Sequence, residues 1–156
     1  MLEKELERIR YDVIDLSEVR WTGTGEALHG RLIYTGEQNK HAKGVGIVMS
    51  ERAKRALISY NPISPRVIVA RFRGRPFDLA VLQAYAPTAD STDDDLEEFY
   101  EQVEEGLRYM KPRDIRVVTG DWNAKIGEDN KGWEHIMGKH GIGGMNDRGE
   151  RLLQFA

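Results

Sequence analysis

An acid and an amide stand two residues apart after an apolar run, as Asp121 and Asn123. The run contains Val117 and Val118 and stops at Gly120, which predicts a strand that ends where the polar residues begin. Strand ends and their loops are where layered α/β proteins usually place chemistry, so the two residues are candidates for a catalytic pair. A polar turn is the alternative, because Gly, Asp and Asn are all turn formers.

Two more polar residues stand at the ends of expected strands. Glu18 follows an expected strand at residues 11–16, and Tyr85 ends another at residues 77–85. If the three strand ends converge, they suit metal-assisted phosphate chemistry, because Mg²⁺ prefers oxygen ligands and often takes only one or two carboxylates. A second carboxylate could activate water, while the Asn123 amide and the Tyr85 hydroxyl could bind phosphate oxygens.

Each of these residues also has an ordinary structural explanation. Glu18 could be a surface acid paired with Arg20, two positions away. Tyr85 could be a half-buried aromatic residue of a sheet, which is a common position for tyrosine. The shared placement at strand ends is what favours the catalytic interpretation.

The remaining pattern predicts a sheet-on-sheet core with helices outside it. Besides those already named, we expect strands at residues 32–35, 44–50, 66–72 and 114–119, and helices at 2–10, 92–112 and 148–155, with a helical turn at 51–57. Residues 21–26 and 127–147 are expected to be loops. The 156 residues suit one domain.

Composition excludes several classes of protein. The sequence has no cysteine, no apolar run long enough to span a bilayer and no secretory signal, so an intracellular location, nuclear or cytoplasmic, is expected. The net charge is −3, which argues against strong nonspecific binding to nucleic acid. Residues 52–77 nevertheless carry seven Arg or Lys and no acid, whereas residues 90–105 carry nine acids and no base. The basic run could face phosphates or could be a solvated face.

Three motifs resemble the endonuclease/exonuclease/phosphatase family in order and spacing. They are Leu16-Ser-Glu-Val-Arg-Trp, Tyr85-Ala-Pro-Thr and Gly120-Asp-Trp-Asn-Ala-Lys-Ile-Gly. Residues 127–155 are similar to endonuclease domains of non-LTR retrotransposons and to the craniofacial development protein 2 group. The resemblance covers essentially the whole chain.

The resemblance implies a fold and a set of roles. The fold would be α+β, a four-layer α/β/β/α sandwich of the DNase I-like type, present here as one partial domain, residues 1–156, truncated at both ends. Glu18 would be the metal ligand for Mg²⁺ or Mn²⁺. Asp121 would position or activate the nucleophile with help from Asn123, and Tyr85 would contact the scissile phosphate.

The function implied is metal-dependent phosphodiester hydrolysis, as a DNA endonuclease of the retrotransposon type. The family's first strand, with its metal-site Asn, and its C-terminal Asp-His lie outside the sequence, so we expect impaired or absent turnover. The alternatives are a non-catalytic domesticated relic that serves as a binding or structural module, and a phosphatase of the same family. DNA is the expected substrate, no membrane association is expected, and the chain is expected to be a monomer.

Overall fold

The computed structural model describes residue 6 and residues 8–156. The helix expected at residues 2–10 lies mostly outside the described residues. The chain divides into two compact units. The sheet unit contains residues 1–85 and 101–121, and the loop unit contains residues 86–100 and 122–156.

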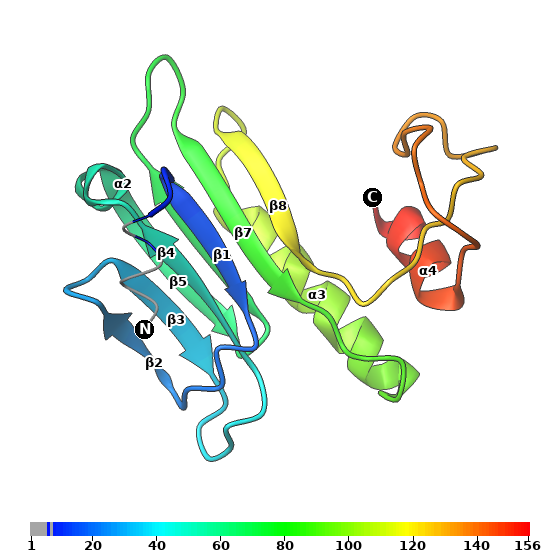
Figure 1. The fold of residues 1–156 in the computed structure, drawn as a ribbon, viewed down its shortest axis with the longest axis horizontal. Coiled ribbons are helices and arrows are strands. Elements are labelled where there is room, and N and C mark those ends of the chain that lie inside the picture. Colours follow the sequence, from blue (N-terminus) through cyan, green and yellow to red (C-terminus); the bar gives the residue numbers. More distant parts are fainter. Residues whose placement is uncertain (1–5, 7) are drawn as a thin grey trace. The chain divides into compact units, whose positions relative to one another are not determined.

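The first sheet of the sheet unit has four antiparallel strands in the order β1-β4-β3-β2 (Figure 1). The strands are β1 (Val13–Ser17), β2 (Thr24–Ala27), β3 (Leu32–Gly36) and β4 (Gly44–Met49). Strand β4 is buried along its whole length, since it pairs with β1 on one side and β3 on the other.

The second sheet has the order β5-β6-β7-β8. Its strands are β5 (Leu57–Ser64), β6 (Val67–Phe72), β7 (Leu79–Tyr85) and β8 (Ile115–Asp121), and the short helix α2 (Glu51–Ala56) leads into β5. Strands β5, β6 and β7 are antiparallel, whereas β8 is parallel to β7. The connection between β7 and β8 contains the long helix α3 (Asp93–Tyr109), as parallel pairing requires a crossover.

The two sheets pack face to face around an aliphatic core. Ile33 and Ile47 of the first sheet lie in one buried cluster with Ile68 and Val81 of the second. The second half of α3 covers the outer face of the second sheet, because a Cβ added at Gly106 would come within 2.7 Å of Leu82 Cδ1. The structure therefore has the α+β character and the sheet-on-sheet core expected from the sequence.

The outer face of the first sheet carries a smaller cluster. Leu6 is buried there with Leu32 and Val48. Among residue 6 and residues 8–156, no complete helix covers the outer face of the first sheet. The four-layer arrangement therefore stays a prediction.

Two strands of the structure were not expected. Residues 21–26 were expected to be a loop, but Thr24–Ala27 is the edge strand β2, paired with β3. Gly25 of β2 lies against the Tyr34 ring, where a Cβ would be 3.0 Å from the hydroxyl. No strand was expected at residues 57–64, where Pro62 sits in β5; an edge strand tolerates proline because one side of its backbone needs no partner.

The loop unit contains the first half of α3, a long loop and the helix α4 (Asp147–Phe155). Helix α3 begins with a reciprocal cap. Asp95 N donates to Thr92 Oγ1 at 3.1 Å, and Thr92 N donates to Asp95 Oδ2 at 3.1 Å. Helix α4 is capped by Asn146, whose side chain accepts from Gly149 N.

Candidate functional site

Three predicted site residues lie at one end of the sheet unit. Strand β8 pairs in parallel with β7 so that Asp121 is opposite Tyr85. From the other sheet, Glu18 follows the last residue of β1, and Tyr85 Oη donates to Glu18 Oε1 at 3.2 Å. The structure therefore brings Glu18, Tyr85 and Asp121 together.

The Tyr85 hydroxyl is held in its protonated form. Burial raises its pKa first, and the nearby charges of Glu18 and Asp121 raise it further, while Arg66 acts in the opposite direction. A protonated phenol can donate a hydrogen bond to an anionic oxygen.

Arg66 is a member of this site that the strand-end argument missed. Its Nη1 donates to the Tyr85 carbonyl at 3.0 Å, and its guanidinium carbon lies 5.3 Å from the centre of the Tyr85 ring. The signal in the sequence was its place in the basic run, on the residue just before β6.

Glu18 sits on unusual backbone. Its φ is +55° and that of Arg20 is +56°, a left-handed conformation that side chains other than glycine seldom adopt. Arg20 Nη2 lies 2.8 Å from Glu18 Oε2, and the Glu18 side chain is 49% exposed. The surface ion pair considered from the sequence therefore exists alongside the hydrogen bond with Tyr85.

Gly120 allows Asp121 to reach its position. Its φ is +143°, and a Cβ there would lie 1.9 Å from the Ala84 carbonyl oxygen of β7. Any side chain would push the end of β8 away from β7. A glycine is therefore required before Asp121, because the backbones of β7 and β8 approach closely there.

A row of polar side chains continues between the sheets behind this end. Gln83 is 1% exposed and its Nε2 donates to Ser17 Oγ at 3.0 Å. Burial raises the pKa of Asp15, and a hydrogen bond with the Thr119 side chain partly offsets this. Sequence reasoning missed this row, although a polar residue within the apolar strand at Gln83 was a visible signal.

Asn123 lies in the loop unit rather than in this cluster. Its φ is +46°, and its Nδ2 donates to the Ala86 carbonyl at 2.9 Å. The amide therefore ties the segment that follows β8 to the segment that follows β7. A direct catalytic role of Asn123 stays a prediction.

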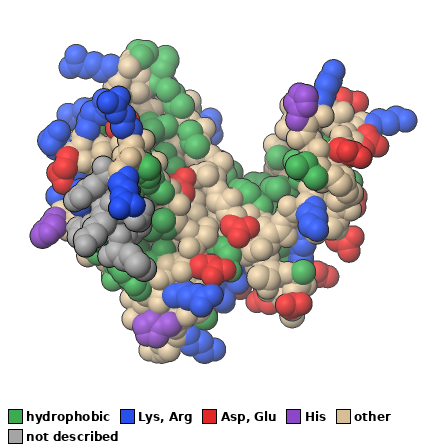
Figure 2. Space-filling model, in the orientation of Figure 1, with side chains coloured by type: hydrophobic (Ala, Val, Ile, Leu, Met, Phe, Trp, Pro, Cys, Tyr) green, Lys and Arg blue, Asp and Glu red, His purple; other side chains and the backbone are tan. Residues whose placement is uncertain are grey.

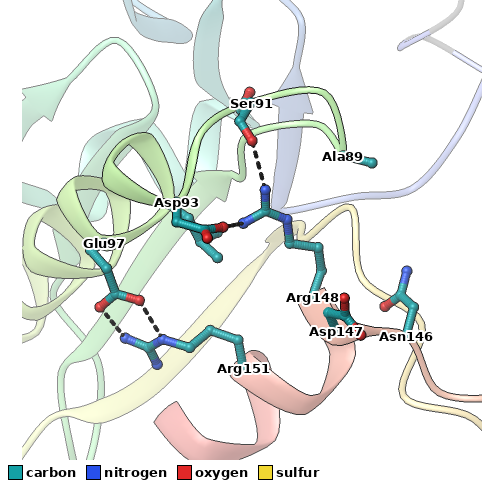
Figure 3. A pocket seen from close by; sticks show the side chains of 9 residues that line it. Ala89, Ser91, Asp93, Glu97, Asn146, Asp147, Arg148 and Arg151 are labelled. Atoms are coloured by element: carbon teal, nitrogen blue, oxygen red, sulfur yellow. Dashed lines mark hydrogen bonds and ion pairs between the residues drawn. The ribbon is translucent and has the colours of Figure 1, made fainter.

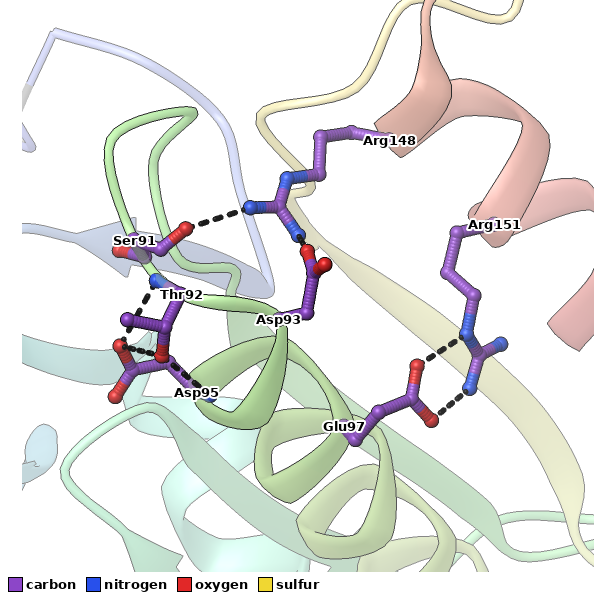
Figure 4. Close-up of polar contacts among 7 residues, drawn as sticks. All are labelled: Ser91, Thr92, Asp93, Asp95, Glu97, Arg148 and Arg151. Atoms are coloured by element: carbon purple, nitrogen blue, oxygen red, sulfur yellow. Dashed lines mark hydrogen bonds and ion pairs between the residues drawn. The ribbon is translucent and has the colours of Figure 1, made fainter.

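The loop unit has a cavity of about 700 Å³ that contains two arginines of α4 (Figure 3). Arg148 Nη2 donates to the Ser91 carbonyl at 2.8 Å, and Arg151 forms two 2.8 Å hydrogen bonds with the Glu97 carboxylate (Figure 4). The Arg151 guanidinium also lies 4.1 Å from the Tyr100 ring centre. Both guanidinium groups are thus engaged in holding α4 against the start of α3, which indicates a structural role.

The donor atoms at the end of the sheet unit fit a hard cation in a limited way. No group of three or more His, Cys, Asp or Glu side chains suited to a metal ion occurs within residue 6 and residues 8–156. Glu18 and Asp121 supply two carboxylates, and Mg²⁺ often binds through one or two, with water and phosphate in its other positions. Two carboxylates therefore fit a Mg²⁺ ion that keeps water and phosphate ligands better than they fit a metal whose ligands all come from the protein.

Comparison with known proteins agrees with this fold. The chain is 36% identical over 157 residues to craniofacial development protein 2 of Bos taurus, and 34% identical over 157 residues to that of Tragulus javanicus. Each alignment covers 99% of the chain. The chain is a homologue of part of craniofacial development protein 2. It spans about a quarter of the length of these relatives, 26% and 27% respectively.

A solved structure shows the same fold. The endonuclease domain of TRAS1, a telomere-specific non-LTR retrotransposon, matches with a TM-score of 0.61 at 18% identity. The match covers 99% of the chain and 60% of the solved one. No protein-family model matches the chain. Among the described residues, no helix is long and apolar enough to cross a membrane.

Proposed function

We propose that the chain carries the metal- and phosphate-binding end of a nuclease that hydrolyses DNA phosphodiesters. The observation that supports this most is the hydrogen bond from Tyr85 to Glu18, with Asp121 opposite Tyr85, at one end of a fold similar to a retrotransposon endonuclease domain. The matched part of TRAS1 is an endonuclease domain, and the motifs of this chain resemble the endonuclease/exonuclease/phosphatase family.

Each residue has a role in the proposal. Glu18, with Asp121 nearby, would hold Mg²⁺ or Mn²⁺, which neutralises charge on the phosphate and the leaving oxygen. Asp121 would accept a proton from the attacking water. The protonated Tyr85 hydroxyl would donate to a nonbridging phosphate oxygen, and Arg66 would keep the Tyr85 ring in place. Asn123 would assist by fixing the backbone that follows Asp121.

Metal binding is the primary test, because the sequence predicts weak turnover. We expect Mn²⁺ to bind the chain at millimolar concentration or below, measured by water-proton relaxation, and Mg²⁺ to compete for the same site. Glu18→Gln should abolish this binding, whereas Glu26→Gln, a matched change on β2, should leave it intact. Equal Mn²⁺ binding by Glu18→Gln would refute the metal role of Glu18.

Cleavage is tested separately by nicking of supercoiled plasmid with Mg²⁺. We expect slow nicking that is lost in Asp121→Asn and reduced by about 10²-fold or more in Tyr85→Phe, the range for removal of one transition-state donor. Nicking that persists at full rate in Asp121→Asn would show that Asp121 is not the base.

A non-catalytic binding module is the second candidate. The observation that favours it is the 2.8 Å ion pair of Glu18 with Arg20, which already neutralises the carboxylate expected to bind the metal. This candidate predicts no response to Mn²⁺ in the wild-type chain and new Mn²⁺ binding after Arg20→Ala. The nuclease proposal predicts Mn²⁺ binding in both.

A further inference from the structure

The end of the sheet unit opposite Glu18, Tyr85 and Asp121 has a distinct charge. Strand pairing places Leu57 beside Phe72 and Leu79 beside Ile115 at that end of the second sheet. Helix α2 connects it to the matching end of the first sheet. We call this surface, residues 8–12, 28–31, 50–56, 73–78 and 111–116, the basic end.

The basic end holds nearly half of the positive charge of an acidic protein. Its segments contain eleven Arg or Lys and only four Asp or Glu, whereas the rest of the chain contains twelve Arg or Lys and twenty-two Asp or Glu. Figure 2 shows Lys and Arg side chains gathered over the part of the sheet unit that carries α2. The net charge of −3 is therefore the sum of a positively charged basic end and a negatively charged remainder of the chain.

The four acids of the basic end are already paired with arginines. Asp12 binds Arg52, and Glu51 lies 3.5 Å from Arg31. Asp78 and Asp114 both contact the buried side chain of Arg71. The acids are thus fewer than the Arg and Lys residues and each already contacts an arginine, so the basic end carries a net positive charge.

Two features give the basic end a shape. A hollow of about 560 Å³ is lined by Arg10, Arg31, Arg52 and Arg55. Beside it, the hairpin between β6 and β7 carries Arg73, Arg75 and Phe77 at its tip (Figure 1). Arg73 N donates to the Ala56 carbonyl at the end of α2, at 2.7 Å, so the hairpin is joined to the helix whose Arg52 and Arg55 line the hollow.

The hairpin tip has exposed side chains that could contact an external ligand. The Arg73 and Arg75 side chains are exposed and have no hydrogen-bond or ion-pair partner among residue 6 and residues 8–156. Phe77 is 53% exposed at the hairpin tip, so most of its ring area is not used in the core. Arginine forks match phosphate geometry, and an exposed aromatic ring between them can pack on a sugar or a base.

We propose that the basic end is a second nucleic-acid contact surface, remote from the cleavage site, that binds the phosphate backbone of DNA. The choice of nucleic acid over another polyanion rests on the proposed function, while the charge and the hairpin are independent of it. From the sequence, the basic run of residues 52–77 could be either a phosphate-facing patch or a solvated face. It supplies five of the eleven Arg or Lys of the basic end.

The test measures binding without cleavage. The anisotropy of a fluorescein-labelled 20-base-pair duplex is recorded with the chain in EDTA over a range of salt concentrations. We expect Arg73→Ala/Arg75→Ala to weaken binding about tenfold and to lower the slope of log K against log salt by about two, one for each phosphate contact. Phe77→Ala should weaken binding with no change of slope.

The matched control is Lys131→Ala/Lys139→Ala, which removes the same charge from exposed positions of the loop unit. It should change both quantities less than the arginine pair does. Circular dichroism and thermal melting check that each variant is folded.

Three results would overturn the proposal. One is an unchanged affinity and slope in the folded arginine variant, and another is an equal effect of the lysine control. The third is that the wild-type chain binds phosphatidylserine vesicles through Arg73 and Arg75 but does not bind the duplex. Duplex affinity that falls in Arg73→Ala/Arg75→Ala but not in Asp121→Asn would support the basic end whether or not Asp121→Asn loses nicking, so the two proposals can fail separately.

Discussion

Acidification is expected to destabilise the sheet unit through Asp114, just before β8. Its carboxylate accepts from Arg71 Nε at 2.7 Å and from Arg71 Nη2 at 2.9 Å, and also from Lys111 N at 2.9 Å. The Arg71 and Asp114 side chains are only 6% and 4% exposed. The pair thereby ties β6 to the start of the strand that carries Asp121 at its other end.

The magnitude follows from the pKa of Asp114. The hydrogen bonds from Arg71, despite an opposing effect of burial, lower this pKa from 3.8 to about 2. A carboxyl whose pKa is lower in the folded state stabilises the fold above its unfolded pKa. This stability is lost as the pH falls from about 4 to about 2, and the shift corresponds to at most about 2 kcal/mol. Roughly half of it is lost by pH 3.

The assay is urea unfolding followed by tryptophan fluorescence at pH 6 and at pH 3, in the wild type and in Asp114→Asn. The wild type should have a higher free energy of unfolding than the variant at pH 6. This gap should be smaller at pH 3, by about 1 kcal/mol. Asp78→Asn is the matched control, because Asp78 is 3.4 Å from the same guanidinium but 34% exposed. A gap between wild type and Asp114→Asn that stays constant from pH 6 to pH 3 would refute the reasoning.

Two further substitutions test the positioning of the site. Gly120→Ala should lower plasmid nicking and Mn²⁺ affinity while the first sheet stays folded, because a Cβ would lie 1.9 Å from the Ala84 carbonyl oxygen; full activity would contradict the argued close approach. Asn146→Ala should destabilise α4 by about 1–2 kcal/mol in urea unfolding, because the side chain accepts from both Gly149 N and Lys125 N; a cost below about 0.5 kcal/mol would show that the cap is dispensable.

Much of the strand pattern was predictable because it depends on local apolar runs. Residues 67–72 and 79–85 are almost continuously apolar and form buried strands, and the stripe of Leu96, Phe99 and Val103 marks α3. Strand β2 was missed because Thr and Gly at residues 22–25 are also turn formers, and only pairing with β3 decides between the two. Strand β5 was missed for the same reason around Asn61 and Pro62.

The meeting of Glu18, Tyr85 and Asp121 was predictable only in part. Each strand end was visible in the sequence, and the family motifs indicated their joint use. That they meet depends on the parallel pairing of β7 with β8 and on the packing of two sheets. Tyr85 and Asp121 are 36 positions apart in the sequence, and Glu18 and Tyr85 are 67 apart. Arg66 and the buried row at Gln83 were missed because their role arises only from this packing.

Backbone conformation separates the candidate site from ordinary turns. Five residues other than glycine have positive φ within the described part of the chain, and two of them, Leu28 and His29, lie in the four-residue connection between β2 and β3. Gly30 N donates to the Ala27 carbonyl at 3.0 Å, so Leu28 and His29 are the central residues of a β-turn, and positive φ at both is normal for a type I′ turn.

The other three are Glu18, Arg20 and Asn123, which follow strands β1 and β8. These three residues do not lie in that β-turn, and such backbone costs on the order of 1–3 kcal/mol per residue. A surface ion pair, which contributes at most about 1 kcal/mol, does not offset that cost at Glu18 and Arg20. Two of the three positions, Glu18 and Arg20, therefore lie at the end of the sheet unit that carries the predicted chemistry, which supports the functional role proposed for this end.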